Sequence, residues 1–320
     1  MRLVTLLLLL LSGCALAAPD TQNFTDDLGR TVAVPLHPQR IVSLHDLDIT
    51  IPLLELGVVP VGSHGRTLAN GQHTLRSARL LTGMDYDNTG MAFIGSADID
   101  IEKVATLKPD LIITSPGRSA DVAQLEKIAP TVSIDHLKGG APRIYSRLAT
   151  LTGHQAQLAL LQARYQAQIQ QLKNTLAGRT VTVSVLQASN GKIALMHSYH
   201  ALGKVLRDAG FHFPALIENI PEDGRLTVSA ERLPDLDADL IFDTWRGDNG
   251  GQPADEIAAM NAVMPGWCQF LRACRQGHYV MVSREEAISN SFAAMSLMVS
   301  VVQTQLAGLS LPPTAEGPQQ

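Results

Sequence analysis

The feature that most constrains the fold of this chain is an internal repeat. The segment Glu102–Ile113 aligns without gaps on Glu231–Phe242, and glutamate, a basic residue, leucine, aspartate, leucine and isoleucine recur in register. Each copy has the pattern of a short helix, a turn and a buried strand, and each occupies a matching place in its half of the chain. The repeat predicts two similar lobes, which form a cleft between them.

Strands and helices alternate in both halves of the chain. Buried-strand patterns occur at residues 40–44, 58–62, 111–114, 131–134, 181–186, 240–242 and 279–282. Helical patterns lie between or after them at residues 51–57, 101–107, 120–128, 201–209 and 286–306. This alternation is typical of α/β folds with parallel-type central sheets, and a length of 320 residues suits two domains. We expect the lobes to span residues 23–140 and 179–308.

The segment between the lobes has a different composition. Alanine, leucine and glutamine dominate residues 141–178, and apolar residues such as Tyr165 and Ile169 recur there at helical spacing. A coiled coil is the other interpretation, but no strict heptad is sustained. We therefore predict one long helix that connects the lobes rigidly, with Thr152–Gly153 as the point where it could break.

The N-terminus has the pattern of an export signal. In residues 1–18 one positive charge precedes the apolar run Leu3–Leu11, which is too short to span a bilayer, and small residues follow. Residues 11–14 also resemble a bacterial lipobox, in which Cys14 would be lipidated and would anchor the protein. Cleavage after Ala17 or Ala18 is the alternative. We expect a periplasmic protein, with or without a lipid anchor, and a disordered tail at residues 309–320.

The other two cysteines, Cys268 and Cys274, lie close together in the sequence. In an oxidising compartment such a pair is more simply a disulfide than a metal site, because no histidine or further cysteine accompanies it at zinc spacing. We predict a disulfide that closes a small loop and stabilises the fold locally.

The charge and the motifs exclude several classes of function. A net charge of −5 without a lysine or arginine run provides no field for a phosphate backbone, so we do not expect nucleic acid as a partner. The sequence contains no nucleophile elbow, no phosphate-binding glycine loop and no zinc-binding helix motif. We therefore expect neither catalysis nor a cofactor, and no resident metal.

The candidate ligand site follows from the ends of the predicted strands. In open parallel sheets, ligands bind beyond the carboxyl ends of the strands. The polar and aromatic residues at these positions are His45, His64, Arg66, Arg118, Trp245, Arg246 and Arg284. Exposed loop arginines are common, but four at equivalent strand ends suit an anionic, partly aromatic ligand through charged hydrogen bonds and stacking.

The cluster His197-Ser198-Tyr199-His200 lies between a predicted strand and a predicted helix. Histidine and tyrosine can ligate haem iron, but packing within the loop is the simpler interpretation because no third ligand is near in the sequence. Tyr199 is included among the candidate ligand-binding residues.

Several motifs together resemble a known family. They are Asp27-Leu28-Gly29-Arg30, then Pro38 to Leu44, then Leu56 to Gly62, and finally Ile101-Glu102 with Leu107 to Ile112. In these motifs the chain resembles the periplasmic binding proteins for ferric siderophores, haem and cobalamin, over nearly all of the mature sequence. The resemblance implies two α/β lobes joined by one long helix, with a hinge that bends little. It also implies a monomer that binds a ferric siderophore without catalysis.

The resemblance implies a membrane partner as well. Proteins of this family present one acidic residue on each lobe to arginine pockets of an ABC permease dimer in the inner membrane. Glu102 and Glu231 occupy these places, at equivalent positions of the repeat. Each could also be an acidic residue in the first turn of a helix, where the helix dipole favours it. Two matched charges are what a two-fold partner needs.

Two alternative functions stay open from the sequence. The chain could carry haem or cobalamin within the same class of importer. From a different class, it could be a metal-dependent enzyme that uses His64, His197 and His200.

Overall fold

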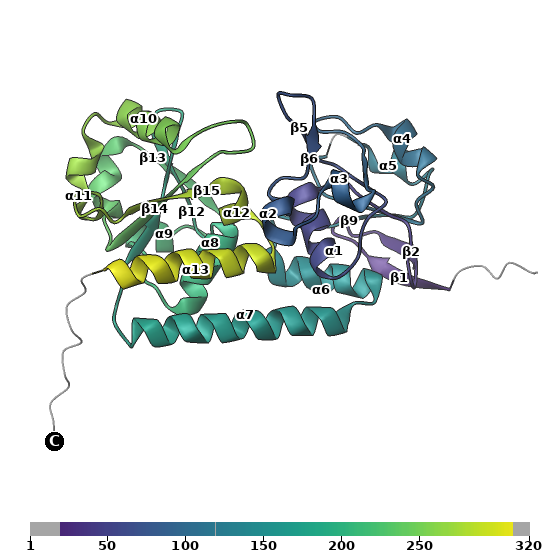
Figure 1. The fold of residues 1–320 in the computed structure, drawn as a ribbon, viewed down its shortest axis with the longest axis horizontal. Helices are drawn as coiled ribbons and strands as arrows, with labels where there is room; N and C mark the ends of the chain where they lie inside the picture. The colour runs from purple at the N-terminus through teal and green to yellow at the C-terminus, as the bar shows by residue number, and fades with distance from the viewer. Residues whose placement is uncertain (1–19, 119, 310–320) are drawn as a thin grey trace, which may run out of the picture.

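A computed structural model describes residues 20–118 and 120–309. Two α/β lobes lie beside each other, and helix α7 (Gln155–Leu176) runs beneath both of them (Figure 1). The export signal predicted at residues 1–18, the lipidation site at Cys14 and most of the tail predicted at 309–320 lie outside the described residues. No described helix combines the length and the apolar character that crossing a membrane requires.

The N-terminal lobe is built on a five-stranded parallel sheet with the order β7-β4-β3-β8-β9. Its strands are β3 (Ile41–Ser43), β4 (Gly62–Ser63), β7 (Ala92–Phe93), β8 (Leu111–Thr114) and β9 (Thr131–Ser133). Its helices are η1 (Asp46–Thr50), α1 (Ile51–Glu55), α2 (Ala78–Thr82), α3 (Tyr86–Thr89), α4 (Ile101–Thr106) and α5 (Val122–Leu125). The predicted strand at 58–62 is shifted to β4, because Val58 to Val61 carry the chain from α1 back to the sheet.

Two hairpins of this lobe were absent from the prediction. They consist of β1 (Thr21–Thr25) with β2 (Thr31–Pro35), and of β5 (Arg66–Thr67) with β6 (His73–Thr74). In β1 and β2 only Phe24, Val34 and Pro35 are buried, so the hydrophobic alternation that marks a strand is weak.

The C-terminal lobe combines a parallel and an antiparallel sheet. The parallel sheet contains β10 (Val183–Val185), β14 (Leu240–Trp245) and β15 (Tyr279–Ser283), and the antiparallel sheet contains β11 (Gln187–Ser189), β12 (Lys192–Met196) and β13 (Arg225–Val228). Its helices are α8 (His200–Ala209), α9 (Ala215–Glu218), η2 (Ala230–Leu236), α10 (Pro253–Val263), η3 (Trp267–Phe270), α11 (Arg272–Arg275), α12 (Arg284–Ile288) and α13 (Phe292–Gly308). Both lobes therefore contain a parallel sheet, but the strands outside that sheet are arranged differently in the two lobes.

The internal repeat corresponds to equivalent structures in the two lobes. The first copy forms α4 and β8, and the second forms η2 and β14. Helix η2 contains Pro234 and has 3-10 rather than α geometry. The repeated aspartates have the same role. Asp110 accepts from the backbone N–H groups of Gln39 and Arg40 at 2.7 and 2.9 Å, just before β3. Asp239 accepts from the backbone N–H and hydroxyl of Thr182 at 2.8 Å, just before β10.

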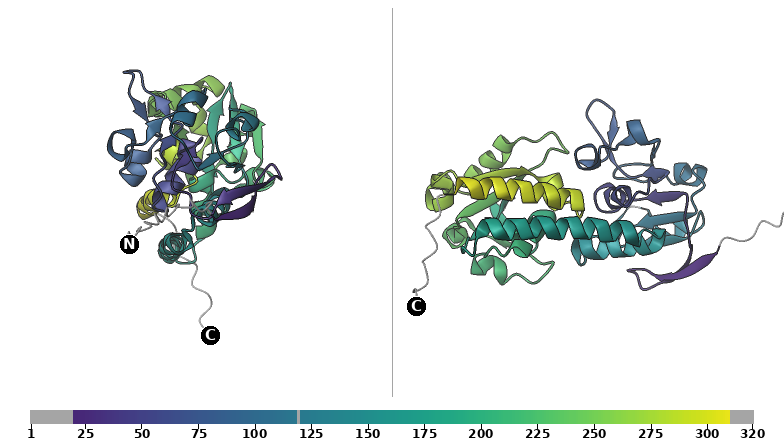
Figure 2. Two further views of the ribbon diagram at one scale, coloured as in Figure 1. Left: turned by 90° about the vertical axis from the view of Figure 1, so that its right-hand side faces the viewer. Right: turned by 60° about the horizontal axis from the view of Figure 1, so that its bottom comes forward.

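The predicted connector at 141–178 is two helices rather than one. Helix α6 (Gly140–Thr152) ends at Gly153, whose φ of 74° is a left-handed conformation that glycine adopts at low cost, and α7 follows. Helix α7 packs against α6, α8 and α13, and Figure 2 shows α7 and α13 running side by side. The helical pattern at 286–306 is likewise divided into α12 and α13, and residues 289–291 lie between them.

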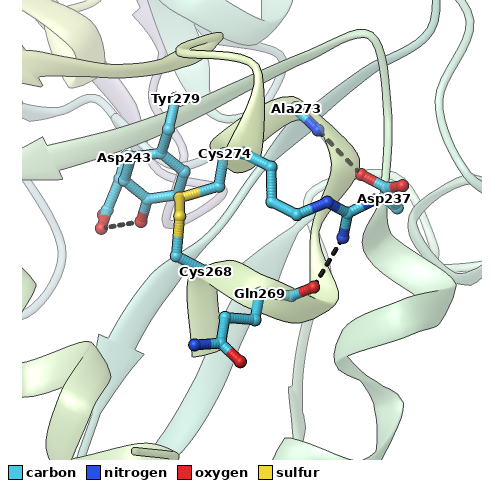
Figure 3. The surroundings of a disulfide bond; sticks show 8 residues. Asp237, Asp243, Cys268, Gln269, Ala273, Cys274 and Tyr279 are labelled. Atoms are coloured by element: carbon cyan, nitrogen blue, oxygen red, sulfur yellow. Dashed lines mark hydrogen bonds between the residues drawn. A yellow bond between two sulfur atoms is a disulfide. The ribbon is translucent and has the colours of Figure 1, made fainter. Parts of the chain in front are cut away.

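Cys268 and Cys274 form a disulfide between η3 and α11, with a Cα–Cα distance of 5.3 Å (Figure 3). Asp237 accepts from the backbone N–H of Ala273, and Tyr279 donates to Asp243 beside it. The bridge therefore stabilises the outer end of the C-terminal lobe.

Candidate functional site

The carboxyl ends of the two parallel sheets open on a cavity between the lobes. This cleft pocket has a volume of about 320 Å³. The N-terminal lobe contributes Arg66, Arg76 and Ser77 to its lining, and the C-terminal lobe contributes Trp245, Asp248, Glu285 and Glu286. Two predicted residues, Arg66 and Trp245, therefore line one pocket although they are far apart in the sequence.

A buried ion pair fixes one side of the pocket. Asp46 is fully buried and accepts from Arg76 Nε and Nη2 at 2.9 and 2.6 Å, and His64 Nδ1 lies 3.2 Å from the same carboxylate. Burial alone would raise the pKa of Asp46, but the Arg76 guanidinium holds this pKa well below its usual range. The predicted ligand residue His64 is itself buried, so it orients Asp46 rather than facing the pocket.

Arg66 and Arg118 have fewer partners than Arg76. The closest carboxylate to Arg66 is Asp248 of the other lobe, with Nε 3.8 Å from Oδ2, and Arg118 forms no ion pair within the described part of the chain. Burial lowers the pKa of both guanidinium groups, and their positive neighbours, Arg76 above all, lower it further. Both arginines therefore provide positive charge that the protein neutralises only in part, but only Arg66 lines the cleft pocket.

The other two predicted arginines are placed differently. Arg246 has a half-exposed side chain and pairs with Asp248 at 3.2 Å. Arg284 donates to Gln187 within the C-terminal lobe and does not line the cleft pocket. The four arginines thus do not form a single cluster around one cavity.

His45 lies in a buried group with Asp48 and His136, whose potential ligand atoms are all within 4.8 Å of one another. His45 Nδ1 accepts from the Asp48 backbone N–H at 3.1 Å, so the neutral imidazole carries its proton on Nε2, which is 3.5 Å from Asp48 Oδ2. A metal ion needs a lone pair on this same nitrogen. The geometry therefore favours a structural role for His45 over metal or ligand binding.

The same group joins the two lobes. Asn290 of the C-terminal lobe donates to Asp48 from its backbone N–H at 3.0 Å and from its side chain at 3.1 Å. The side chain of Asn290 also donates to the backbone carbonyl of His136 at 3.2 Å. These bonds fix the segment that follows α12 against the N-terminal lobe.

The predicted cluster at 197–200 lies away from the cleft pocket. Tyr199 is buried and its hydroxyl is 2.5 Å from the Thr244 hydroxyl, and burial raises the pKa of Tyr199 to about 12. His197 and His200 line a second cavity of about 340 Å³ beside the start of α6, and burial lowers the pKa of His200 to about 4. Within residues 20–118 and 120–309, they form no three-residue metal site with His64.

Glu102 and Glu231 are both exposed, and each lies in the first turn of its short helix, α4 or η2. They occupy equivalent positions in the two lobes because the repeat forms equivalent elements. Neither contributes to the cleft pocket.

Four charged lining residues are not among those predicted from the sequence: Arg76, Asp248, Glu285 and Glu286. Glu285 and Glu286 come directly after β15 and Arg284, so the rule that selected Arg284 could also have selected them. No local signal marks Arg76, because its importance comes from Asp46, which is 30 residues away in the sequence.

Comparisons with known proteins agree with this architecture. The iron(3+)-hydroxamate-binding protein FhuD of Bacillus subtilis is 28% identical over 246 residues, which cover 73% of this chain and 74% of that protein. The ferric enterobactin-binding periplasmic protein FepB of Escherichia coli is 31% identical over 215 residues, which cover 63% of this chain and 66% of that protein.

Solved structures show the same fold. Staphylococcus aureus SirA, complexed with staphyloferrin B, superposes with a TM-score of 0.74 at 20% identity, covering 90% of this chain and 99% of SirA. The model of the family described as "Periplasmic binding protein" matches residues 85–279, which is more than half of the chain. With two lobes, a cleft between them and this match, the chain belongs to the periplasmic binding protein family.

Proposed function

We propose that this protein binds a ferric siderophore in the cleft pocket and delivers it to the permease of an ABC importer. The observation that carries this proposal is the pocket between two lobes, lined by arginines on one side and by Trp245 on the other. The names of the relatives support it, since FhuD and FepB are described as binding ferric hydroxamates and ferric enterobactin.

The ligand is expected to carry negative charge on the part that faces the N-terminal lobe. Arg66 lines the pocket there and Arg118 adds positive charge from nearby, and neither is within 3.5 Å of a carboxylate among the described residues. Guanidinium groups form charge-assisted hydrogen bonds with carboxylates and catecholates, and Trp245 offers an apolar surface for stacking. His45, His64 and Tyr199 are buried and do not line the cleft pocket, so their proposed role is structural.

Delivery requires a surface that the permease can recognise. Glu102 and Glu231 suit this role because they are exposed at equivalent places of the two lobes. We propose a periplasmic carrier without catalytic activity, held at the membrane by a lipid on Cys14 and acting as a monomer.

Titration of tryptophan fluorescence tests the proposed ligand. The panel contains ferric citrate, ferric enterobactin and a ferric hydroxamate, each beside its iron-free form, with haem and cobalamin as alternatives. Trp245 lines the pocket whereas Trp267 is buried, so a Trp245→Phe variant identifies the responding side chain. Saturable quenching by a ferric complex supports the proposal. Saturation by haem or cobalamin alone would contradict it.

A further inference from the structure

The C-terminal side of the cleft pocket carries carboxylates that an anion-binding site does not need. Asp248, Glu285 and Glu286 line the pocket opposite Arg66 and Arg76. The side chain of Asp248 is 5% exposed, and Glu285 and Glu286 are 5% and 6% exposed. Burying carboxylates costs free energy unless they are paired, so three of them at one face require partners.

Glu286 has an oxygen without such a partner. Its Oε1 accepts from the Ser77 hydroxyl at 2.6 Å, which is a hydrogen bond between the two lobes. Its Oε2 is buried and has no hydrogen-bond partner among the described residues, and no lysine or arginine described by the structure pairs with Glu286. A buried carboxylate oxygen requires a donor that the described residues do not supply here, and the pocket that Glu286 lines is a place from which a ligand can supply it.

Of the two neighbouring carboxyl groups, Asp248 carries the negative charge, which its ion pair with Arg246 offsets in part. Glu285 Oε2 accepts from the backbone N–H of Gly247 and from the Ser283 hydroxyl, both at 3.2 Å. Burial and the nearby Asp248 raise the pKa of Glu285, whereas Arg246 outweighs burial and lowers the pKa of Asp248. Asp248 therefore keeps its charge while Glu285 retains its proton more readily, and an ionised carboxylate stays at this side of the pocket.

We infer that Glu286, with Asp248 in the lining of the same pocket, forms a subsite for a protonated amine of the ligand. This inference rests on the proposed function and specifies the ligand further. The ligand would be a ferric complex that carries an ammonium group, with its negatively charged part toward Arg66 and Arg118. Glu286 comes from one lobe and its partner Ser77 from the other, so the ammonium group binds at the seam and contacts both lobes.

A pair of complexes that differ only at the amine tests this subsite. Ferrioxamine B has a neutral ferric trihydroxamate core and a free primary amine, so it probes the amine alone. Acetylation converts that amine to a neutral amide without changing the hydroxamate groups that hold the iron. We expect the wild-type protein to bind ferrioxamine B about ten- to a hundredfold more tightly than the N-acetyl form, the usual effect of one hydrogen bond to a charged group.

Substitutions test whether Glu286 and Asp248 cause the preference for the free amine. Glu286→Gln keeps the acceptor for Ser77 and removes the charge, so it should reduce the affinity for ferrioxamine B to that for the N-acetyl form. Asp248→Asn should reduce the same preference in part and serves as a second variant if Glu286→Gln folds poorly. Glu218→Gln is the matched control, since Glu218 lies in the same lobe, pairs with Arg207 and does not line the pocket.

The outcomes separate this inference from the proposed function. Equal affinity for ferrioxamine B and its N-acetyl form would overturn the amine subsite and leave the siderophore carrier standing. Binding of ferric citrate with no binding of either ferrioxamine would do the same. A preference that survives both Glu286→Gln and Asp248→Asn would also overturn it. If no ferric complex of the whole panel binds, the proposed function itself fails.

Discussion

At the scale of single residues, the cleft pocket contains both fixed and available charges. Arg76 donates to Asp46 through two nitrogen atoms, so its position and much of its charge are already used within the protein. Arg66 and Arg118 have no such bidentate partner among the described residues. A ligand therefore gains most binding free energy from Arg66 and Arg118, whereas Arg76 maintains the shape of the pocket.

Alanine substitutions test this division. Arg66→Ala should weaken ligand binding by about 1.5 to 3 kcal/mol, which is about a ten- to hundredfold loss of affinity, without lowering the melting temperature. Arg118→Ala should have a smaller effect, because Arg118 does not line the pocket. Arg284→Ala should change affinity by less than about 0.5 kcal/mol because Arg284 bonds to Gln187 outside the pocket. The exposed Arg79→Ala is the control. Wild-type affinity in the Arg66→Ala variant would show that the ligand is neutral there.

At the scale of secondary-structure elements, Glu55 connects the two lobes through the start of α13. Its carboxylate accepts from the backbone N–H groups of Phe292 and Ala293 at 3.1 and 2.8 Å and from the Tyr145 hydroxyl. These bonds satisfy donors that the first turn of a helix leaves free. Burial nevertheless dominates, and it raises the pKa of Glu55 to about 7.

This raised pKa predicts a pH dependence of stability. The folded state binds the proton more tightly than the unfolded chain, whose glutamate has a pKa of about 4.3. The resulting stabilisation is complete below that value and is lost as the pH rises through about 7. Between pH 4.5 and 7.5, the unfolding free energy of the wild type should decrease. In the Glu55→Gln variant, this decrease should be smaller by about 1 to 3 kcal/mol. Urea unfolding at both pH values measures the unfolding free energy of each protein. An equal decrease of this free energy with pH in the wild type and in the variant would refute the prediction.

The disulfide crosslinks a short segment of the C-terminal lobe. It joins residues that are six positions apart, between η3 and α11 at the end of the lobe farthest from the cleft (Figure 1). Replacing both cysteines by serine should lower the unfolding free energy by about 2 kcal/mol, since the loop is short. Ligand affinity should stay unchanged. A large loss of affinity would mean that this end of the lobe is coupled to the pocket.

At the scale of the whole molecule, the two lobes present matched charges on separate helices. The charge reversals Glu102→Lys and Glu231→Lys should abolish uptake in cells that depend on this carrier, because opposite charges at a permease interface would become like charges. Affinity for the ligand should stay within a few-fold, since neither residue lines the pocket. Loss of ligand binding in these variants would contradict a docking role.

Membrane attachment is a second property of the whole molecule. If Cys14 carries the lipid, Cys14→Ala should move the protein from the membrane fraction to the soluble fraction after cell lysis. Immunoblotting of both fractions measures this. A wild-type protein that is already wholly soluble would rule out the anchor.

The sequence alone predicted the arrangement in two α/β lobes, but not the two N-terminal hairpins or the division of the connector into α6 and α7. The repeat at 102–113 and 231–242 predicted the two lobes, because equivalent local patterns fold into equivalent elements such as β8 and β14. The rule for strand ends also placed Arg66 and Trp245 correctly at the pocket, since the carboxyl ends of parallel strands meet at one edge of a sheet.

Only the tertiary structure decided which polar residues face the ligand and which support them. Periodicity reports whether a position is buried, but it does not identify the partner that makes burial possible. The pairing of Arg76 with Asp46 and of Asn290 with Asp48 depends on how loops and lobes pack across long separations in the chain. The same packing turned His45 and His64 inward and left Glu286 with an unpaired oxygen at the cleft.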